Sequence, residues 1–549
     1  MTSGATFEGP PLSSLGDLGT LTLGHFLLDV CDRFADREAL VFDDPLLDGA
    51  TVRWTYADLR DHSLALARAL VAAGLPPGGR VAVLMGNRPE AIAAIFGAAL
   101  AGGVAVPLST FAPSAELESM VQRAEPTVVL TQTLLKGRPL TELRSGRAVA
   151  LGSDDWELFL ERGRTVPADV VDDRVGSVGP DDEGLILFSS GTSAEPKGMV
   201  HRHEAPTLQF HVQADLFRRT TSSRVWAPLP LFWTAGLTTA MGPTLAGGGT
   251  FVLQEVFDAG EALRLMERER VTEPYVLPHQ GAALAEHPDW ERVDLSSLRE
   301  VYGKSVFHRH PTVDGDTTWV APAGYGMSET CAGVISHRWD TPREEVARYT
   351  GRLLPGVRLR VLDPDTGDVL AQGETGELAL AGPTVLVHYL GTTPEETLDP
   401  DGFLHTGDLG WVEPDGAVHW VGRRTEMIKT AGANVAPAEI EVALRPFRDV
   451  RRARVVGLPD PRLGEIVTLC VELADGSTAT ADDLRSFLAE RLASYKVPRE
   501  VVIFGAGEMP TTANDAKVRN DELIALAAER LGRPSPGSGH GSTRGTQRR

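Results

Sequence analysis

Short apolar runs alternate with longer amphipathic stretches along most of the chain. Residues 80–85 (RVAVLM) predict a buried strand, residues 89–100 predict a helix, and residues 104–106 predict a second strand. Further strands are expected at 128–130 and 148–150. Strands that alternate with helices are typical of α/β layers around a largely parallel sheet, and the sequence shows no repeat of fixed period.

A long stretch without charged residues covers residues 91–115, between Glu90 and Glu116. Gly102 and Gly103 divide it and Pro107 interrupts it, which leaves a short helix followed by a short strand. A membrane span needs about 20 consecutive apolar residues. We therefore interpret this stretch as buried core and expect no membrane span.

The overall composition limits the kinds of partner. The chain has 549 residues, 42% hydrophobic and 23% charged, as expected of a globular protein with two or more domains. Its 53 basic and 75 acidic side chains give a formal net charge of −22, which argues against nucleic acid or an anionic membrane as a partner. Cys31, Cys331 and Cys470 lack metal-ligand or disulfide spacing, and the first residues do not resemble a signal peptide. We therefore expect a cytoplasmic protein.

Lysine is rare in this chain. Six of the 53 basic residues are lysine and the other 47 are arginine. Arginine presents a planar fork, whereas lysine is a small, mobile point charge. With this bias we expect lysine mainly where arginine cannot replace it. The candidates are Lys136, Lys197, Lys304, Lys429, Lys496 and Lys517.

A loop rich in hydroxyls and glycines, residues 189–198 (SSGTSAEPKG), follows the apolar run 185–188. Hydroxyls and backbone N–H groups can surround phosphoryl oxygens, and Lys197 supplies a compact positive charge. The loop is not a Walker A motif, because Pro196 precedes the lysine and Gly198 follows it. It is either a phosphate-binding loop or a polar surface turn.

Three further stretches carry candidate chemistry. Residues 323–330 (AGYGMSET) contain Tyr325, whose ring offers a face for a nucleobase, and Glu329, whose oxygens could hold Mg²⁺. Asp408 could accept hydrogen bonds from ribose, or it could cap a turn. Trp233 lies at the end of a Pro-rich strand and either lines an acyl or aryl pocket or is part of the core.

These stretches together resemble the adenylate-forming superfamily, which includes acyl-CoA synthetases, stand-alone adenylation domains of peptide synthetases, and luciferases. The resemblance runs from Trp54 to Arg519, with the motifs in family order and at family spacing. The motifs are FGAALAGGVAVPL (96–108), SSGTSAEPKG (189–198), PLFWTAGL (230–237), GYGMSET (324–330), GELALAGP (376–383), HTGDLGW (405–411) and GRRTEMIKTAG (422–432).

The resemblance implies an α/β fold in two parts. A large N-terminal domain, residues 21–422, would combine α/β layers with a β-barrel-like portion. A hinge at 423–427 would join it to a small, mobile α+β domain at 428–532. We expect the ends of the chain, residues 1–20 and 533–549, to be disordered because they are rich in small and polar residues.

The resemblance also implies a role for each matching position. The nucleotide-binding residues would be Ser189, Ser190, Gly191, Thr192, Ser193, Lys197, Tyr325, Gly326, Ser328, Asp408 and Arg423. The catalytic residues would be Lys517, Thr192, Glu329 and Lys429, with Glu329 and Thr192 also binding Mg²⁺. The acyl pocket would contain Trp233, Gly324 and Lys304, the thiol side Gly432, and the hinge Thr425.

In this family a carboxylate attacks the α-phosphate of ATP to give an acyl-adenylate and pyrophosphate, and a thiol or amine then displaces AMP. Two anions must meet in the first step, so Mg²⁺ and lysines are needed to stabilise the developing charge. The resemblance implies an acid–CoA ligase that uses ATP, Mg²⁺, coenzyme A and a small carboxylic acid. The alternatives are an adenylation enzyme that serves a carrier-protein thiol or another nucleophile, and a nucleotide-binding protein without catalysis. A homodimer is also left open.

The chain departs from the family pattern at several positions. Ala194 replaces a glycine of the phosphate loop, which restricts positive φ angles there. Thr425 stands where the hinge usually has Asp or Lys, and Lys517 lies one residue further from Pro510 than usual. Lys304 could pair with a second acidic group of the substrate, narrow the tunnel, or be a solvated loop residue.

Overall fold

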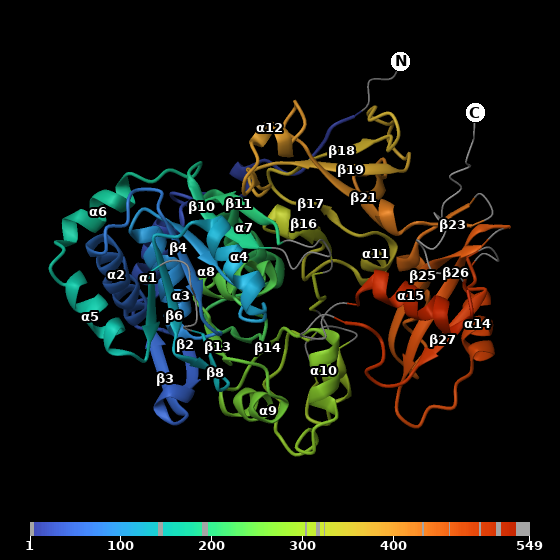
Figure 1. Cartoon of the computed structure of the whole chain (residues 1–549), viewed down its shortest axis with the longest axis horizontal. Helices are drawn as coiled ribbons and strands as arrows, with labels where there is room; N and C mark the ends of the chain where they lie inside the picture. The colour runs from blue at the N-terminus through green and yellow to red at the C-terminus, as the bar shows by residue number, and fades with distance from the viewer. Residues whose placement is uncertain are drawn as a thin grey trace, which may run out of the picture.

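The computed structural model of the chain has a large N-terminal part and a smaller C-terminal part (Figure 1). The structure describes residues 5–140, 147–188, 196–301, 305–314, 319–322, 324–430, 433–460, 462–492, 496–511 and 518–533. No helix in these ranges combines the length and the apolar content that crossing a membrane requires.

A seven-stranded sheet forms the first layer of the N-terminal domain. Its order is β20–β11–β10–β5–β4–β6–β9, and the five strands from β10 to β9 run parallel. The strands are β4 (Arg80–Leu84), β5 (Val104–Pro107), β6 (Val128–Gln132), β9 (Ala148–Leu151), β10 (Glu183–Phe188), β11 (Gly198–Arg202) and β20 (His388–Tyr389). The strands predicted at 80–85, 104–106, 128–130 and 148–150 are all present, which confirms the parallel sheet.

Helix α3 (Pro89–Leu100) is buried along almost all of its length, as predicted for a core helix. It packs closely on α2 (Tyr56–Ala72), because Gly97 leaves room for the neighbouring helix. A Cβ at Gly97 would lie 3.0 Å from the Leu66 Cβ and 3.1 Å from the Ser63 carbonyl oxygen. Residues 91–107 are therefore core helix and strand, whereas Phe111 and residues 113–115 at the end of the stretch are exposed.

A second sheet has the order β14–β12–β13–β2–β3, in which only the β2–β3 pair is antiparallel. Its strands are β2 (Glu38–Asp44), β3 (Ala50–Thr55), β12 (Arg224–Trp226), β13 (Thr250–Leu253) and β14 (Glu273–Pro274). The other helices of this domain are α1 (Leu23–Phe34), α4 (Ser114–Ala124), α5 (Asp154–Gly163), α6 (Ala168–Gly176), α7 (Glu204–Phe217), α8 (Gly242–Ala246), α9 (Ala259–Arg268), α10 (Pro278–Ala285), α11 (Arg343–Arg348) and α12 (Pro394–Thr397).

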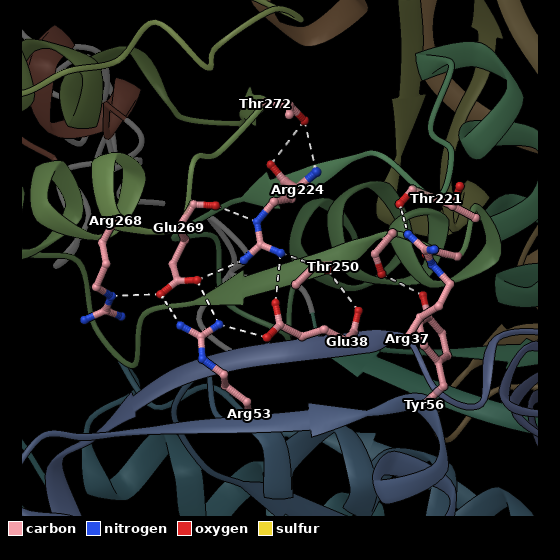
Figure 2. Close-up of polar contacts among 12 residues, drawn as sticks. Arg37, Glu38, Arg53, Tyr56, Thr221, Arg224, Thr250, Arg268, Glu269 and Thr272 are labelled. Atoms are coloured by element: carbon pink, nitrogen blue, oxygen red, sulfur yellow. Dashed lines mark hydrogen bonds and ion pairs between the residues drawn. The ribbon is translucent and has the colours of Figure 1, made fainter.

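A network of ion pairs centred on Glu269 holds this second sheet to the end of α9 (Figure 2). The Glu269 side chain is only 3% exposed and accepts hydrogen bonds from Arg53 at 2.7 Å, Arg224 at 2.9 Å and Arg268 at 2.8 Å. Glu38 accepts from Arg53 and Arg224 at 2.8 Å each. Burial alone would raise the pKa of Glu269, but the hydrogen bonds from Arg53 and Arg268 hold it below its ordinary value.

An antiparallel sheet, in the order β1–β18–β19–β21–β22, forms the barrel-like portion that we predicted. Its strands are β1 (Phe7–Glu8), β18 (Arg358–Leu362), β19 (Gly376–Ala381), β21 (Leu404–Val412) and β22 (Val418–Arg423). A smaller sheet contains β15 (Gly324–Met327), β16 (Ala332–Ser336) and β17 (Arg352–Leu353). The expectation of disorder is wrong for residues 7–8, because Phe7 pairs with Leu359 and β18 offers its edge to the passing chain.

The C-terminal domain has its own apolar core and lies to the right in Figure 1, in orange and red. Its sheet has the order β24–β23–β26–β25, with β27 paired to β26. The strands are β23 (Ile428–Thr430), β24 (Ala433–Val435), β25 (Val450–Asp460), β26 (Gly464–Leu473) and β27 (Glu500–Phe504), and the helices are α13 (Pro437–Leu444), α14 (Ala481–Ala489) and α15 (Asn520–Arg530).

The chain changes partners within the predicted hinge, residues 423–427. Arg424 bonds to Asp365 of the N-terminal domain at 3.4 Å. Glu426 instead accepts hydrogen bonds from Arg454 at 3.0 Å and Asn520 at 3.2 Å, both in the C-terminal domain. A hinge at this point fits these contacts, and its rotation stays a prediction.

We expect Glu269→Gln to lower the thermal stability of the N-terminal domain, because three guanidinium groups lose their charged acceptor. Hydrogen bonds to charged groups contribute about 1.5–3 kcal/mol each, so the free energy of unfolding should fall by an amount of that order. Differential scanning calorimetry measures the change. The control is Asp29→Asn, which breaks the exposed Arg33–Asp29 pair of 3.1 Å and should cost less than about 0.5 kcal/mol.

The same variant should show a defined pH dependence. Because the pKa of Glu269 is lowered by folding, its stabilising effect is complete above its ordinary value of 4.5 and is lost as the pH falls through the folded value. The difference in melting temperature between the wild type and Glu269→Gln should therefore shrink as the pH falls below 4.5. A difference that stays constant under acid conditions would show that Glu269 stabilises the fold by some other means than its charge.

Candidate active site

Tyr325 and Asp408 lie on different sheets and are joined by a hydrogen bond. The Tyr325 hydroxyl, on β15, donates to Oδ2 of Asp408, on β21, at 2.7 Å. Both residues are buried. Burial raises the pKa of Tyr325 well above its ordinary value, and the Asp408 carboxylate raises it further. The phenol therefore stays neutral and is a permanent donor to the carboxylate.

Two residues of β22 complete this cluster. The Trp420 ring stacks on Tyr325, with ring centroids 6.1 Å apart and planes inclined by 27°. Arg423 lies opposite Asp408 in the β21–β22 register, and its Nε is 3.5 Å from Oδ1 of Asp408. An aromatic face, a carboxylate and a guanidinium thus lie together. The structure brings together Tyr325, Asp408 and Arg423, which the sequence had assigned to adenine and ribose.

Glu329 and Lys197 meet at a residue that the sequence did not single out, Tyr389 of β20. The Tyr389 hydroxyl donates to Oε1 of Glu329 at 3.1 Å, and Nζ of Lys197 lies 5.4 Å from the centre of the Tyr389 ring. This distance is within the range of a cation–π interaction. Burial and the Glu329 carboxylate raise the pKa of Tyr389, so its hydroxyl remains a donor.

The Glu329 carboxylate has the chemistry of a magnesium ligand. Tyr389 occupies Oε1, and no described residue contacts Oε2, which is a hard oxygen suited to Mg²⁺. Across the described ranges, no three His, Cys, Asp or Glu side chains gather in a metal-binding arrangement. That agrees with the usual behaviour of Mg²⁺, which takes one or two carboxylates and completes its shell with water and substrate phosphates.

His201 of β11 holds the backbone of Ser328. The His201 side chain is fully buried, and its Nε2 lies 3.0 Å from the Ser328 carbonyl oxygen. Because a carbonyl can only accept, Nε2 carries the proton. Burial lowers the pKa of His201 to about 4, so the ring is neutral at neutral pH. The Leu386 N–H, just before β20, donates to the Glu329 carbonyl at 2.7 Å, so the backbone of both residues of the turn is held by neighbouring segments.

The glycines around Tyr325 allow β15 and β16 to pack backbone to backbone. A Cβ at Gly324 would lie 2.1 Å from the Ile335 carbonyl oxygen, and a Cβ at Gly326 would lie 2.2 Å from that of Ala332. Either side chain would force the strands apart. Backbone packing therefore accounts for both glycines, and the predicted place of Gly324 in an acyl pocket stays a prediction.

Trp233 lines a cavity of about 240 Å³. One wall of this cavity is aromatic, since Phe111, Phe232 and Trp233 meet edge to face with ring centroids 5.3 to 6.0 Å apart. The other lining residues are Gly86, Asn87, Thr110, Pro228, Pro230, Glu255, Val256, Phe257, Leu277, His279 and Gln280. The cavity therefore has both an apolar wall and a polar wall.

A single π-helical segment, η3 (Ala235–Met241), connects the cavity to the Glu329 turn. Trp233 lies two residues before this segment, and Thr238 within it donates to the Cys331 carbonyl at 2.7 Å. Cys331 directly follows the 3₁₀ turn Ser328–Thr330. Gly236 is required here, because a Cβ would lie 2.1 Å from the Pro230 carbonyl oxygen. The predicted pocket residue Trp233 is thus linked to the predicted magnesium ligand.

Several predicted site residues lie outside the described residues: Ser189, Ser190, Gly191, Thr192, Ser193, Lys304, Gly432 and Lys517, together with the side chain of Thr425. Their roles stay predictions. Lys429 is described, and it lies exposed on β23 of the C-terminal domain, where its N–H donates to Oε2 of Glu465 at 2.6 Å. The structure therefore does not bring Lys429 to either cluster.

Tyr389, His201 and Trp420 are the residues that sequence reasoning missed. His201 carried a signal, because it interrupts an otherwise apolar strand (GMVH) close after Lys197. Tyr389 and Trp420 carried none, since each lies in a short strand-like run, and their contacts with Glu329 and Tyr325 come from residues distant in the sequence.

Comparison with known proteins finds relatives that match nearly the whole chain. The model of the AMP-binding enzyme family matches residues 27–390, and that of the AMP-binding enzyme C-terminal domain matches residues 439–516. A feruloyl-CoA synthase from Amycolatopsis sp is 34% identical over 470 residues, which cover 84% of this chain and 91% of that protein.

Two other similar proteins extend the comparison. An indoleacetate–CoA ligase from Aromatoleum aromaticum is 32% identical over 489 residues, which cover 87% of this chain and 94% of that protein. The crystal structure of an anthranilate CoA ligase in complex with anthranoyl-AMP aligns with a TM-score of 0.76 at 23% identity, covering 95% of this chain and 99% of that one. This last likeness shows that the fold is shared.

We expect Tyr389→Phe to weaken the binding of magnesium–ATP by about 5- to 10-fold, because Glu329 loses the hydroxyl that orients it. The ring that Lys197 contacts is kept. Isothermal titration calorimetry measures the affinity. The control is Tyr349→Phe, because the Tyr349 hydroxyl donates to Glu345 outside both clusters. This control should leave the affinity for magnesium–ATP unchanged. Wild-type affinity in Tyr389→Phe would rule out this role for Tyr389.

Proposed function

This chain belongs to the AMP-binding enzyme family, and on that premise we propose that its acid substrate carries an aromatic ring. The enzyme is an AMP-forming acid–CoA ligase. It activates a carboxylic acid with ATP and Mg²⁺ and transfers the acyl group to coenzyme A. The open question is which acids it accepts.

The first step must overcome the repulsion between two anions. A carboxylate oxygen of the acid bonds to the α-phosphorus of ATP while the bond from that phosphorus to the bridging oxygen breaks, and pyrophosphate leaves. Bound Mg²⁺ neutralises part of the phosphate charge. We assign Lys197 to the same task, because its compact charge is held beside Tyr389, next to Glu329.

The Tyr325 cluster suits the nucleoside part of ATP. An adenine ring would stack on the face of Tyr325 opposite Trp420, which keeps the phenol ring in place. Asp408 already accepts from Tyr325 through Oδ2, so Oδ1 would receive a ribose hydroxyl beside Arg423. The second step, in which the thiol of coenzyme A displaces AMP, would use Lys429 and Gly432 after rotation of the C-terminal domain.

The proposal that the substrate is an aromatic acid rests on the aromatic wall of the cavity. Phe111, Phe232 and Trp233 offer ring edges and faces, which favour a planar ring over a flexible chain. The volume of about 240 Å³ lies below the range of about 300–1,000 Å³ typical of drug-sized ligands, so a small acid fits better than a long one. Two relatives support the same class, since their names specify feruloyl and indoleacetate groups.

A panel of acids tests the proposal. We expect kcat/KM for pyrophosphate release to be at least about tenfold higher for arylacetic and arylpropenoic acids than for linear acids of equal carbon number, a difference of about 1.4 kcal/mol in transition-state binding. Trp233→Leu keeps the site apolar and should reduce this ratio, because the ring contacts are lost. Equal rates for aromatic and linear acids would refute the aromatic substrate class.

Lys517 gives a second test, which concerns the order of steps. As proposed, it neutralises the reacting carboxylate and α-phosphate, so Lys517→Ala should lower acid-dependent ATP–pyrophosphate exchange by at least about 100-fold. The same variant should still convert supplied acyl-adenylate and coenzyme A into acyl-CoA, because this lysine would have left the site by then. Lys517→Arg keeps the charge and serves as the control. Exchange at the wild-type rate in Lys517→Ala would show that the lysine was wrongly assigned.

Three further expectations belong to this proposal. A carrier-protein thiol is the alternative acyl acceptor. If product assays show that the enzyme prefers it to coenzyme A, the carrier protein would take the place of coenzyme A in this proposal. A homodimer would be seen by light scattering.

The cytoplasm is the expected compartment, and the three free, buried cysteines support it: Cys31, Cys331 and Cys470.

A further inference from the structure

The polar wall of the cavity carries a carboxylate that the nucleotide chemistry does not use. Glu255 follows β13 and lines the cavity on which Trp233 also lies. Its side chain is 9% exposed. Gly86 makes room for it, because a Cβ at that position would lie 2.7 Å from Cγ of Glu255. A carboxylate is therefore built into the wall of an otherwise largely apolar cavity.

Arg88 lies behind this wall and is shared by three carboxylates. Its side chain is 1% exposed and contacts Asp44 at 2.9 Å, Glu90 at 2.8 Å and Glu255 at 3.3 Å. One guanidinium thus faces three acidic groups, and Glu255 makes the longest of the three contacts. Neutralising Arg88 does not require Glu255, because Asp44 and Glu90 already bind it more closely.

The two oxygens of Glu255 are used differently. Oε1 accepts both from Arg88 at 3.3 Å and from Gln132 at 2.9 Å. Within the described residues, Oε2 has no partner. The Asn87 amide, which also lines the cavity, does not fill it, because it is already bonded to the backbone of Leu229 and Leu231.

Gln132 fixes the orientation of the carboxylate. Its Oε1 accepts from the Gly86 N–H at 2.8 Å, so its Nε2 must be the end that donates. That nitrogen donates to the Leu134 carbonyl at 2.6 Å as well as to Glu255. The Glu255 carboxylate is thus held from two sides before any ligand enters, and its second oxygen is a preorganised acceptor.

We propose that Glu255 determines specificity by accepting, through Oε2, a hydrogen bond from an O–H or N–H group of the substrate arm in this cavity. This inference rests on the proposed function, which provides two arms with such donors. One is the acid, through a hydroxyl or amine on its ring. The other is coenzyme A, through the amide N–H groups of the arm that carries its thiol. An acid or thiol lacking a donor leaves a buried carboxylate oxygen unpaired and binds more weakly.

Glu255→Gln is the test variant, because it keeps an oxygen for Arg88 and Gln132 but replaces the free acceptor by an NH₂ donor. Glu90→Gln is the matched control, since it removes a charge from the same guanidinium without lining the cavity. Calorimetric melting of both variants measures how much stability each loses. Should Glu255→Gln fail to fold, Glu255→Asp keeps the charge but withdraws the acceptor from the cavity.

Two kinetic assays distinguish whether the donor belongs to the acid or to coenzyme A. ATP–pyrophosphate exchange without coenzyme A, with a pair of aromatic acids that differ by one ring hydroxyl, reports the acid arm. The KM for coenzyme A in acyl-CoA formation reports the thiol arm. For the substrate that contacts Glu255, we expect Glu255→Gln to lower kcat/KM by about 10- to 100-fold. Glu90→Gln should change the same kcat/KM by less than about twofold.

The outcomes are clear-cut. A loss confined to the hydroxylated acid assigns the donor to the acid, and a loss confined to coenzyme A assigns it to the thiol arm. Unchanged values in both arms, or equal losses in Glu255→Gln and Glu90→Gln, would overturn the proposal. The aromatic substrate class is judged from the wild-type acid panel alone, so its failure is separate from that of Glu255.

Discussion

The hydrogen bond from Tyr325 to Asp408 is the interaction on which the arrangement of the site depends. A buried carboxylate is stable only where donors compensate for its lost hydration. Asp408 accepts a hydrogen bond from Tyr325 at 2.7 Å and forms an ion pair with Arg423 at 3.5 Å, and these two partners lie on different strands. The bond therefore fixes β15 of the small sheet against β21 of the barrel-like sheet. Everything that follows Tyr325 closely in the chain, the Glu329 turn included, is placed by this contact.

The Glu329 turn lies between the edge of the seven-stranded sheet and η3. His201 and Tyr389, on two strands at the edge of the seven-stranded sheet, hold its backbone and its carboxylate. Thr238 in η3 ties the end of the turn to the cavity beside Trp233. On the proposed function, the magnesium–nucleotide site and the acid site would thereby be connected through one short segment.

The division of labour between arginine and lysine is borne out by several contacts. Arginine forms the buried ion pairs of the interior. The buried Arg219 forms a bidentate pair with Glu273 at 2.9 and 2.6 Å. Arg88 binds three carboxylates. A planar, always charged fork suits such fixed multiple bonds. Lys197, by contrast, lies over the Tyr389 ring next to Glu329, where a compact charge fits. Lys496 pairs with Glu439 at 2.6 Å within the C-terminal domain.

The sequence by itself determined the parallel core and predicted the candidate site residues. Strands at 80–85 and 104–106 follow from local apolar runs, and Tyr325, Glu329 and Asp408 follow from motifs whose residue types carry the chemistry. Only the tertiary structure decided which groups support them. The Tyr389 hydroxyl reaches Glu329 and the Trp420 ring stacks on Tyr325 from other sheets, and Glu255 meets Arg88 and Gln132 from distant parts of the chain. Such contacts cross long sequence separations, and no local pattern encodes them, because each partner alone is an ordinary core or surface residue.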